Sequence, residues 1–206
     1  MDWGIIYHPD SNIDLCAIPI FLFLEYRHLS GENFFLRTIN HDLIPTETQW
    51  KSIEPIEEIF MIGYPDGLWD EHNNMPIVRR GITATAPYLN YNGKREFLID
   101  AACFPGSSGS PVFLCNNGSY VDKAQKDIII GSRIHFLGIV YKGPMHKIDA
   151  SFEKDGRRID SPVNSTVNIP NNLGVVIRAN VLDDFLPLIK EYEENLKKSH
   201  DGHEFK

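Results

Sequence analysis

The chain has 206 residues, of which 42% are hydrophobic and 23% are charged, and its formal net charge at pH 7 is −8. This composition is typical of a globular protein with a core of ordinary size. The acidic balance argues against nucleic acid as a partner, because phosphate binding needs a basic face. The most apolar stretch, residues 15–24, is about half the length of a membrane span and contains Pro19, so we expect no membrane partner.

The cysteines indicate the compartment. There are three of them, Cys16, Cys103 and Cys115, and they show neither close pairs nor the spacing of a metal site. A secreted domain of this size usually carries a paired disulfide framework. The first residues also lack the positive region and apolar run of a signal peptide. We therefore expect a cytoplasmic protein.

Short runs rich in Ile, Leu, Val, Phe and Thr dominate the first 180 residues, and clusters of Gly, Pro, Asn and Asp separate them. The predicted strands cover residues 14–24, 34–39, 59–63, 77–85, 96–102, 111–114, 128–130, 135–141 and 173–179. Residues 116–126 and 147–172 are polar and turn-rich, which predicts surface excursions. Many short strands with turns between them predict an all-β barrel or sandwich.

The end of the chain predicts a C-terminal α-helix. Asn180 is a suitable N-cap, and Asp183 and Asp184 would lie in the first turn, where the helix dipole favours negative charge. Apolar residues recur on one face of this helix: Val181, Leu182, Phe185, Leu186, Leu188 and Ile189. Such a face predicts packing against the rest of the fold. Residues 200–206 are expected to form a flexible tail.

The string F-L-I-D-A-A-C-F-P-G-S-S-G-S-P-V-F-L, residues 97–114, carries the chemistry. A predicted strand enters, a Gly/Ser-rich turn follows, and a second strand leaves through Pro111. Acyl transfer to serine needs an exposed hydroxyl beside backbone N–H groups that stabilise the developing oxyanion. Gly106 permits the unusual backbone conformation that such a turn requires.

This turn resembles that of trypsin/chymotrypsin-like serine peptidases, because Gly106, Ser108, Gly109 and Pro111 match the family's G-x-S-G-G/S-P pattern. The resemblance implies Ser108 as the nucleophile, with the N–H groups of Gly106 and Ser108 as oxyanion donors. The competing α/β-hydrolase pattern, G-x-S-x-G between a strand and a helix, fails twice. Position 110 is Ser, and residues 111–114 look like a strand.

Asp14, in I-D-L-C-A-I-P-I at residues 13–20, resembles the family's D-L/I-A segment, whose aspartate orients the catalytic histidine. Asp14 and Ser108 are 108 − 14 = 94 residues apart, and roughly 93 residues separate the two in chymotrypsin. The resemblance therefore implies Asp14 as the triad carboxylate.

The string F-L-G-I-V-Y-K-G, residues 136–143, resembles the strand that lines the family's specificity pocket, with Tyr141 and Gly143 at substrate-binding positions. Ala102 falls where trypsins place an acidic pocket base. Its lack of charge predicts a preference for apolar or small side chains before the cleaved bond, and not for Lys or Arg.

The histidine of the triad is missing from its expected position, which lies roughly 45 residues before the aspartate. His8 is six residues from Asp14, but nothing around it resembles the family's histidine motif. Two explanations stay open: a truncated peptidase, or a shortened relative that binds polypeptides without cleaving them. In either case the first barrel would be incomplete. We expect a partner or a missing N-terminal segment to cover it.

The resemblance thus implies a trypsin-like double β-barrel with an incomplete first barrel and a C-terminal α-helix. Residues 1–55 are interpreted as the remnant of the first barrel, 56–199 as the second barrel plus the helix, and 200–206 as the tail. The implied function is a serine endopeptidase that acts on polypeptide substrates. The sequence shows neither the spaced ligands of a metal site nor a phosphate-binding glycine motif, so we expect no metal and no cofactor.

Overall fold

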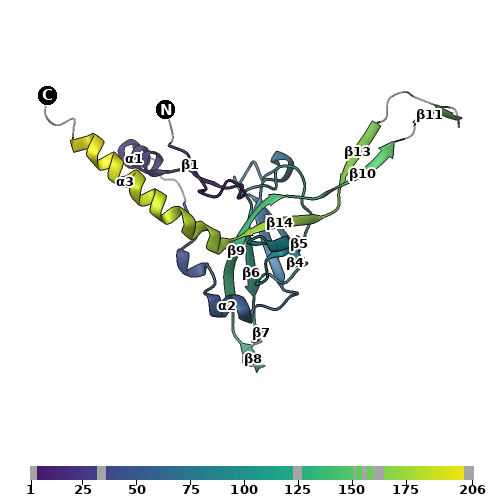
Figure 1. Cartoon of the computed structure of the whole chain (residues 1–206), viewed down its shortest axis with the longest axis horizontal. Helices are drawn as coiled ribbons and strands as arrows, with labels where there is room; N and C mark the ends of the chain where they lie inside the picture. The colour runs from purple at the N-terminus through teal and green to yellow at the C-terminus, as the bar shows by residue number, and fades with distance from the viewer. Residues whose placement is uncertain are drawn as a thin grey trace.

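Six antiparallel strands close into a barrel at the centre of the molecule (Figure 1). The computed structural model describes residues 4–31, 36–122, 127–150, 152–154, 157–159 and 165–201. The order around the barrel is β14–β5–β4–β3–β6–β9, and β9 pairs with β14 to close it. The bounds are β3 Glu58–Gly63, β4 Ile77–Thr83, β5 Glu96–Asp100, β6 Pro111–Asn116, β9 Arg133–Lys142 and β14 Leu173–Arg178.

The barrel interior is the hydrophobic core. Buried and less buried residues alternate along β3 and β6, as expected when successive side chains point to opposite faces of a strand. Phe97 on β5 and Leu114 on β6 are among the side chains with no exposed surface. Trp50 joins the core from the short helix α2 (Glu47–Ser52), which begins with a capping box between Thr46 and Gln49.

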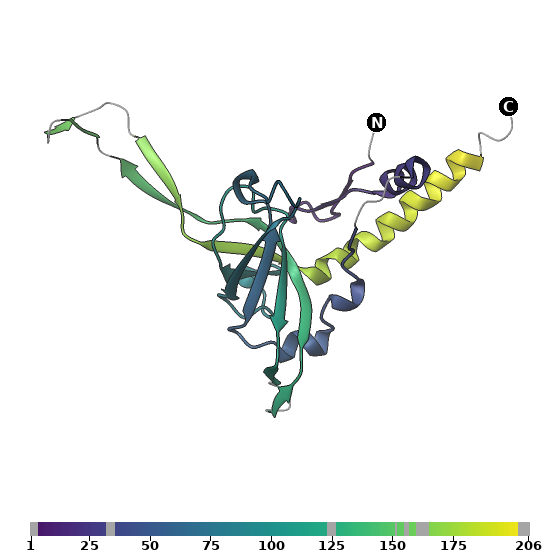
Figure 2. The ribbon, with the colours of Figure 1, turned by 180° about the vertical axis from the view of Figure 1, so that it is seen from behind.

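The remaining elements surround or extend from the barrel. A hairpin of β1 (Ile6–Tyr7) and β2 (Cys16–Ala17) precedes helix α1 (Phe21–Ser30), which lies beside helix α3 (Leu186–Asp201) in both views (Figures 1 and 2). Two-stranded arms are formed by β7 (Ser119–Asp122) with β8 (Asp127–Ile130), by β10 (Met145–Ala150) with β13 (Ser165–Pro170), and by β11 (Phe152–Lys154) with β12 (Arg157–Ile159). Short 3₁₀ turns are η1 (His41–Leu43), η2 (Pro65–Gly67), η3 (Tyr91–Gly93) and η4 (Ala179–Phe185).

The expectation of a mostly β fold with a barrel and a C-terminal helix is confirmed at that level. Seven of the nine predicted strands correspond to observed strands: β3, β4, β5, β6, β8, β9 and β14. None of the described helices is long and apolar enough to cross a membrane.

Two predicted strands near the N-terminus are wrong. Only Cys16–Ala17 of residues 14–24 is a strand, and Phe21 begins α1. Residues 36–39 form no strand, whereas 34 and 35 lie outside the described residues. Strand propensity needs a neighbouring strand to be realised, and among the described residues β2 pairs only with the two-residue β1.

Other differences concern loops and caps. Residues 147–172 were expected to be a surface excursion without regular structure, but β10 and β13 pair over six residues and project from the barrel (Figure 2). Asn180 does not cap the C-terminal helix, because the 3₁₀ turn η4 already begins at Ala179. Most of the expected tail, residues 202–206, lies outside the described residues.

Candidate functional site

The turn that carries Ser108 connects β5 to β6 and is held by hydrogen bonds on both sides of that residue. Ser107 is 3% exposed, and its N–H donates to the carbonyl of Phe104 at 3.0 Å. Its Oγ accepts from the N–H of Phe104 at 3.2 Å. On the other side, the N–H of Gly109 donates to the carbonyl of Val140 on β9 at 2.7 Å. Ser108 therefore lies between two residues, Ser107 and Gly109, that hydrogen bonds hold in place.

Glycine is required at two positions of this turn. Gly106 has φ +83° and Gly109 has φ +87°, values that other residues adopt only with strain. A Cβ on Gly106 would also lie 3.0 Å from the backbone N of Asp66 and from the carbonyl O of Tyr64, whereas a Cβ on Gly109 would meet nothing within 4 Å. Gly106 thus lets the Ser108 turn pack directly on the η2 turn.

Two backbone N–H groups of the turn are left without an acceptor. Hydrogen bonds use the N–H groups of Ser107, Gly109 and Ser110, but among the described residues none uses that of Gly106 or Ser108. Both residues are exposed, so their N–H groups can bond to water. They are available to an acceptor from outside the chain.

The Ser108 hydroxyl faces a cavity of about 480 Å³ and donates to the carbonyl of Tyr141 at 3.0 Å. Asp14 lines the same cavity from the N-terminal segment, together with Tyr7, Leu15, Cys16, Gly109, Ile139, Val140 and Tyr141. The structure thus brings Ser108, Asp14 and Tyr141 to one cavity, although 94 residues separate the first two.

His8, in the hairpin that carries Asp14, packs against the rest of the fold. The His8 side chain is 1% exposed, and its Nδ1 accepts from the N–H of Asp10 at 3.0 Å. The other ring nitrogen, Nε2, lies 3.2 Å from Oδ2 of Asp184. The ring edge also meets Phe185, with 5.2 Å between centroids. His8 therefore serves as a buried anchor facing η4.

Asp184 contacts a second residue, Arg95, in addition to His8. The Arg95 guanidinium donates to both carboxylate oxygens of Asp184. These hydrogen bonds are the main reason why the pKa of Asp184 lies below its ordinary value. The pKa of Arg95 is raised by the same pairing. The Asp184 carboxylate is thus ionised at neutral pH between Arg95 and His8.

A general base for Ser108 is missing from the cavity, because no histidine occurs among the described residues that line it. His8 faces Asp184, and His41 pairs with Asp183 at 2.7 Å. Within the described part of the chain, no group of three or more His, Cys, Asp or Glu side chains could hold a metal ion.

The other two predicted substrate-binding residues lie outside the lining of this cavity. The carbonyl of Ala102 accepts a hydrogen bond from Arg79 of β4, whose guanidinium lies 5.0 Å from the ring centroid of Phe104. A Cβ on Gly143 would lie 3.6 Å from Cβ of Cys103, the residue after Ala102. Sequence reasoning missed Arg79, because its partner is 23 residues away and no local pattern marks the pair.

Tyr141 makes a further connection that sequence reasoning missed. Its hydroxyl donates to Oε1 of Glu96 at 2.9 Å. Burial, followed by the hydrogen bond to Glu96, raises the pKa of Tyr141, so the phenol stays neutral. Tyr141 therefore makes two hydrogen bonds: its backbone carbonyl accepts from Ser108, and its hydroxyl donates to Glu96.

Comparisons of the chain with family models, curated proteins and solved structures found no match.

Proposed function

We propose that the protein is a serine endopeptidase of trypsin-like fold that cleaves polypeptides through an acyl-enzyme on Ser108. The observation that carries this proposal is the arrangement of the turn. Ser108 lies exposed between fixed neighbours, the N–H groups of Gly106 and Ser108 are left free by the described residues, and Asp14 lines the same cavity. In this interpretation the closed barrel is the second barrel of the fold, and residues 1–55 are what remains of the first.

The proposed reaction assigns a role to each of these groups. The Ser108 Oγ attacks the substrate carbonyl and transfers its proton to a histidine that Asp14 orients. The N–H groups of Gly106 and Ser108 stabilise the resulting oxyanion. The histidine then gives the proton to the leaving amine as the C–N bond breaks, which leaves the acyl-enzyme. Water then hydrolyses the ester. The histidine has to enter the cavity from outside its described lining, in a partner or in a further segment of the protein.

Labelling with a fluorophosphonate tests the nucleophile. Without a base the serine hydroxyl is a weak nucleophile, so we expect slow labelling, with the phosphonyl group on Ser108 by mass spectrometry. Ser108→Ala should abolish the labelling, whereas Ser119→Ala, on the exposed hairpin, should leave it unchanged. Equal labelling of Ser108→Ala would remove the assignment.

The cavity without a described histidine favours a second candidate, a module that binds extended polypeptides without cleaving them. The β1–β2 hairpin, whose Tyr7 and Cys16 line the cavity, would then pair with the bound segment by strand addition. A protein that binds peptides but never labels on Ser108, even with an added base, would favour this alternative.

A further inference from the structure

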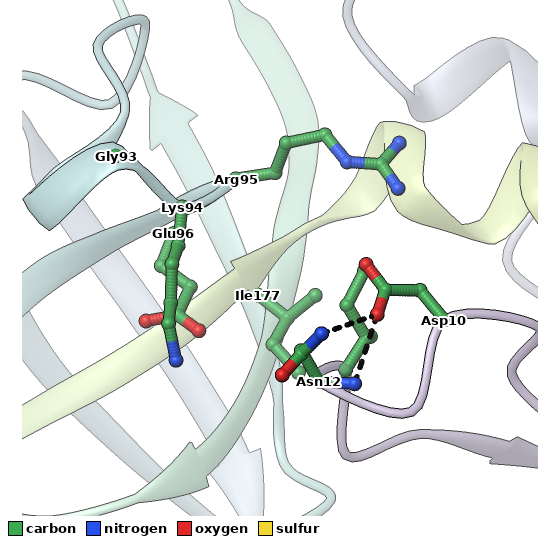
Figure 3. Close-up of a pocket in the computed structure, with 8 residues that line it drawn as sticks. Asp10, Asn12, Gly93, Lys94, Arg95, Glu96 and Ile177 are labelled. Atoms are coloured by element: carbon green, nitrogen blue, oxygen red, sulfur yellow. Dashed lines mark hydrogen bonds between the residues drawn. The ribbon is translucent and has the colours of Figure 1, made fainter.

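A second pocket lies on the other side of the Asp14 hairpin. It has a volume of about 350 Å³, within the range of small-ligand sites. Its walls are the turn between β1 and β2, the segment from η3 into β5, and one residue of β14. Figure 3 shows Lys94 and Glu96 on one side, Asp10 and Asn12 on the other, and Ile177 between them.

Glu96 is the residue that points to a ligand. It is only 7% exposed, and among the described residues its carboxylate accepts one hydrogen bond, from the neutral phenol of Tyr141. Within the described part of the chain, no cationic side chain forms an ion pair with it. Buried charges in proteins are normally paired. A cation in the pocket would supply the missing partner.

Three more features of the pocket restrict the chemical class of ligand that fits it. The Asp10 carboxylate adds a second negative group, held in place by the backbone and side-chain N–H groups of Asn12 at 2.9 Å each. Arg95 is neutralised by Asp184, and its guanidinium extends away from Glu96 in Figure 3. Ile13 and Ile177 provide apolar wall. An alkyl stem that ends in a cation fits this combination, and Lys94 opposes it.

The position relative to Ser108 identifies the source of such a group. Ile13 lines the second pocket and the next residue, Asp14, lines the Ser108 cavity. Tyr141 lines that cavity and bonds to Glu96. We propose that the Glu96 pocket is a subsite that binds the Lys or Arg side chain of an extended polypeptide lying in the Ser108 cavity. Only the polypeptide source of the cation rests on the proposed function.

Peptide binding to the intact chain tests this subsite. The probes are alanine hexapeptides with one lysine placed at each position in turn, and a matched series with norleucine, which keeps the stem and removes the ammonium. Titrations of ¹⁵N-labelled protein should show lysine binding about tenfold tighter than norleucine at one position, with shifts at Glu96 and Ile177. Equal affinity for the two series would overturn the proposal.

Three variants make the test specific. Glu96→Gln keeps an acceptor for Tyr141 and should remove the preference for lysine. Asp10→Asn, at an exposed residue where folding is not at risk, should weaken the preference about threefold. Lys94→Gln should strengthen lysine binding about threefold, because it removes the opposing charge. Glu71→Gln, a remote exposed change of the same charge, should have no effect; an equal loss there would overturn the subsite.

Two further results separate the subsite from the proposed function. If n-butylammonium shifts Glu96 but no hexapeptide position favours lysine, the polypeptide source is wrong and the ligand is a free amine. If lysine is favoured while Ser108 never labels with fluorophosphonate, the cation subsite stands and the peptidase assignment fails.

Discussion

The barrel and the N-terminal segment, residues 4–44, contain apolar runs of similar composition but use them differently. In the barrel, strands such as β3 and β6 alternate buried and less buried residues around side chains with no exposed surface. In the N-terminal segment, Ile18, Tyr26 and Leu29 are all more than half exposed. Burial within a closed sheet stabilises the barrel. The segment that carries Asp14 is instead attached through polar and ring contacts, with His8 facing Asp184 and Phe185.

Truncating one apolar residue in each region gives the largest expected contrast. Phe97→Ala should lower the free energy of unfolding by about 3–5 kcal/mol, because Phe97 is fully buried in the barrel. Leu29→Ala on α1 should change it by less than about 0.5 kcal/mol, because Leu29 is 78% exposed. Urea denaturation of the two variants measures this difference. A loss of more than about 2 kcal/mol in Leu29→Ala would show that α1 is covered in solution.

The two glycines of the Ser108 turn give the next contrast. Gly106→Ala combines positive-φ strain with close contacts to Asp66 and Tyr64, so it should destabilise by roughly 3 kcal/mol. Gly109→Ala adds the strain alone and should cost roughly 1 kcal/mol. Thermal melts of both variants, with fluorophosphonate labelling of each, check the order. Equal losses would mean that the turn does not pack on η2.

Asp184→Asn should loosen the N-terminal segment selectively. It removes the ion pair with Arg95 and the charge that faces His8, at a cost of roughly 1 kcal/mol. Hydrogen exchange should increase in residues 6–17 and stay unchanged in β3 and β6. Equal increases in both regions would contradict the division between them.

The Asp184 carboxylate, which faces His8, should also give the wild-type protein a pH dependence. The folded pKa of Asp184 is lowered, chiefly by Arg95, below an unfolded value of about 3.9. Its contribution is therefore complete at neutral pH and is lost as pH falls through the lowered folded value. Exchange in residues 6–17 should rise over that acidic range in the wild type and vary less in Asp184→Asn. Identical profiles would rule out this source.

The comparison also shows what the sequence could and could not predict. Strands β3, β4, β5 and β9 were predictable because their β-rich runs pair with neighbours that close the barrel. The same type of run at residues 14–24 has almost no strand to pair with, and it turns into α1. A local pattern records propensity, whereas pairing depends on residues far along the chain.

For the candidate site, turn motifs and spacing in the sequence predicted Ser108, Gly106 and Asp14, and the structure places Ser108 and Asp14 at one cavity. The roles of Arg79 with Ala102, of Glu96 with Tyr141 and of His8 with Asp184 were not predictable. Each joins residues at least 23 positions apart, and only the folded barrel brings them together.

The measurement that tests the central claim most directly is the rescue of Ser108 labelling by free imidazole. If Asp14 and Ser108 act in one cavity, added imidazole should raise the fluorophosphonate labelling rate about 100-fold, as a general base does. Asp14→Asn should lower the rescued rate at least about tenfold, because the Asp14 carboxylate would orient the imidazole and stabilise the imidazolium that forms. The slow rate without imidazole should stay the same in both proteins. A rescue of equal size in the wild type and in Asp14→Asn would contradict a shared catalytic role for Asp14 and Ser108.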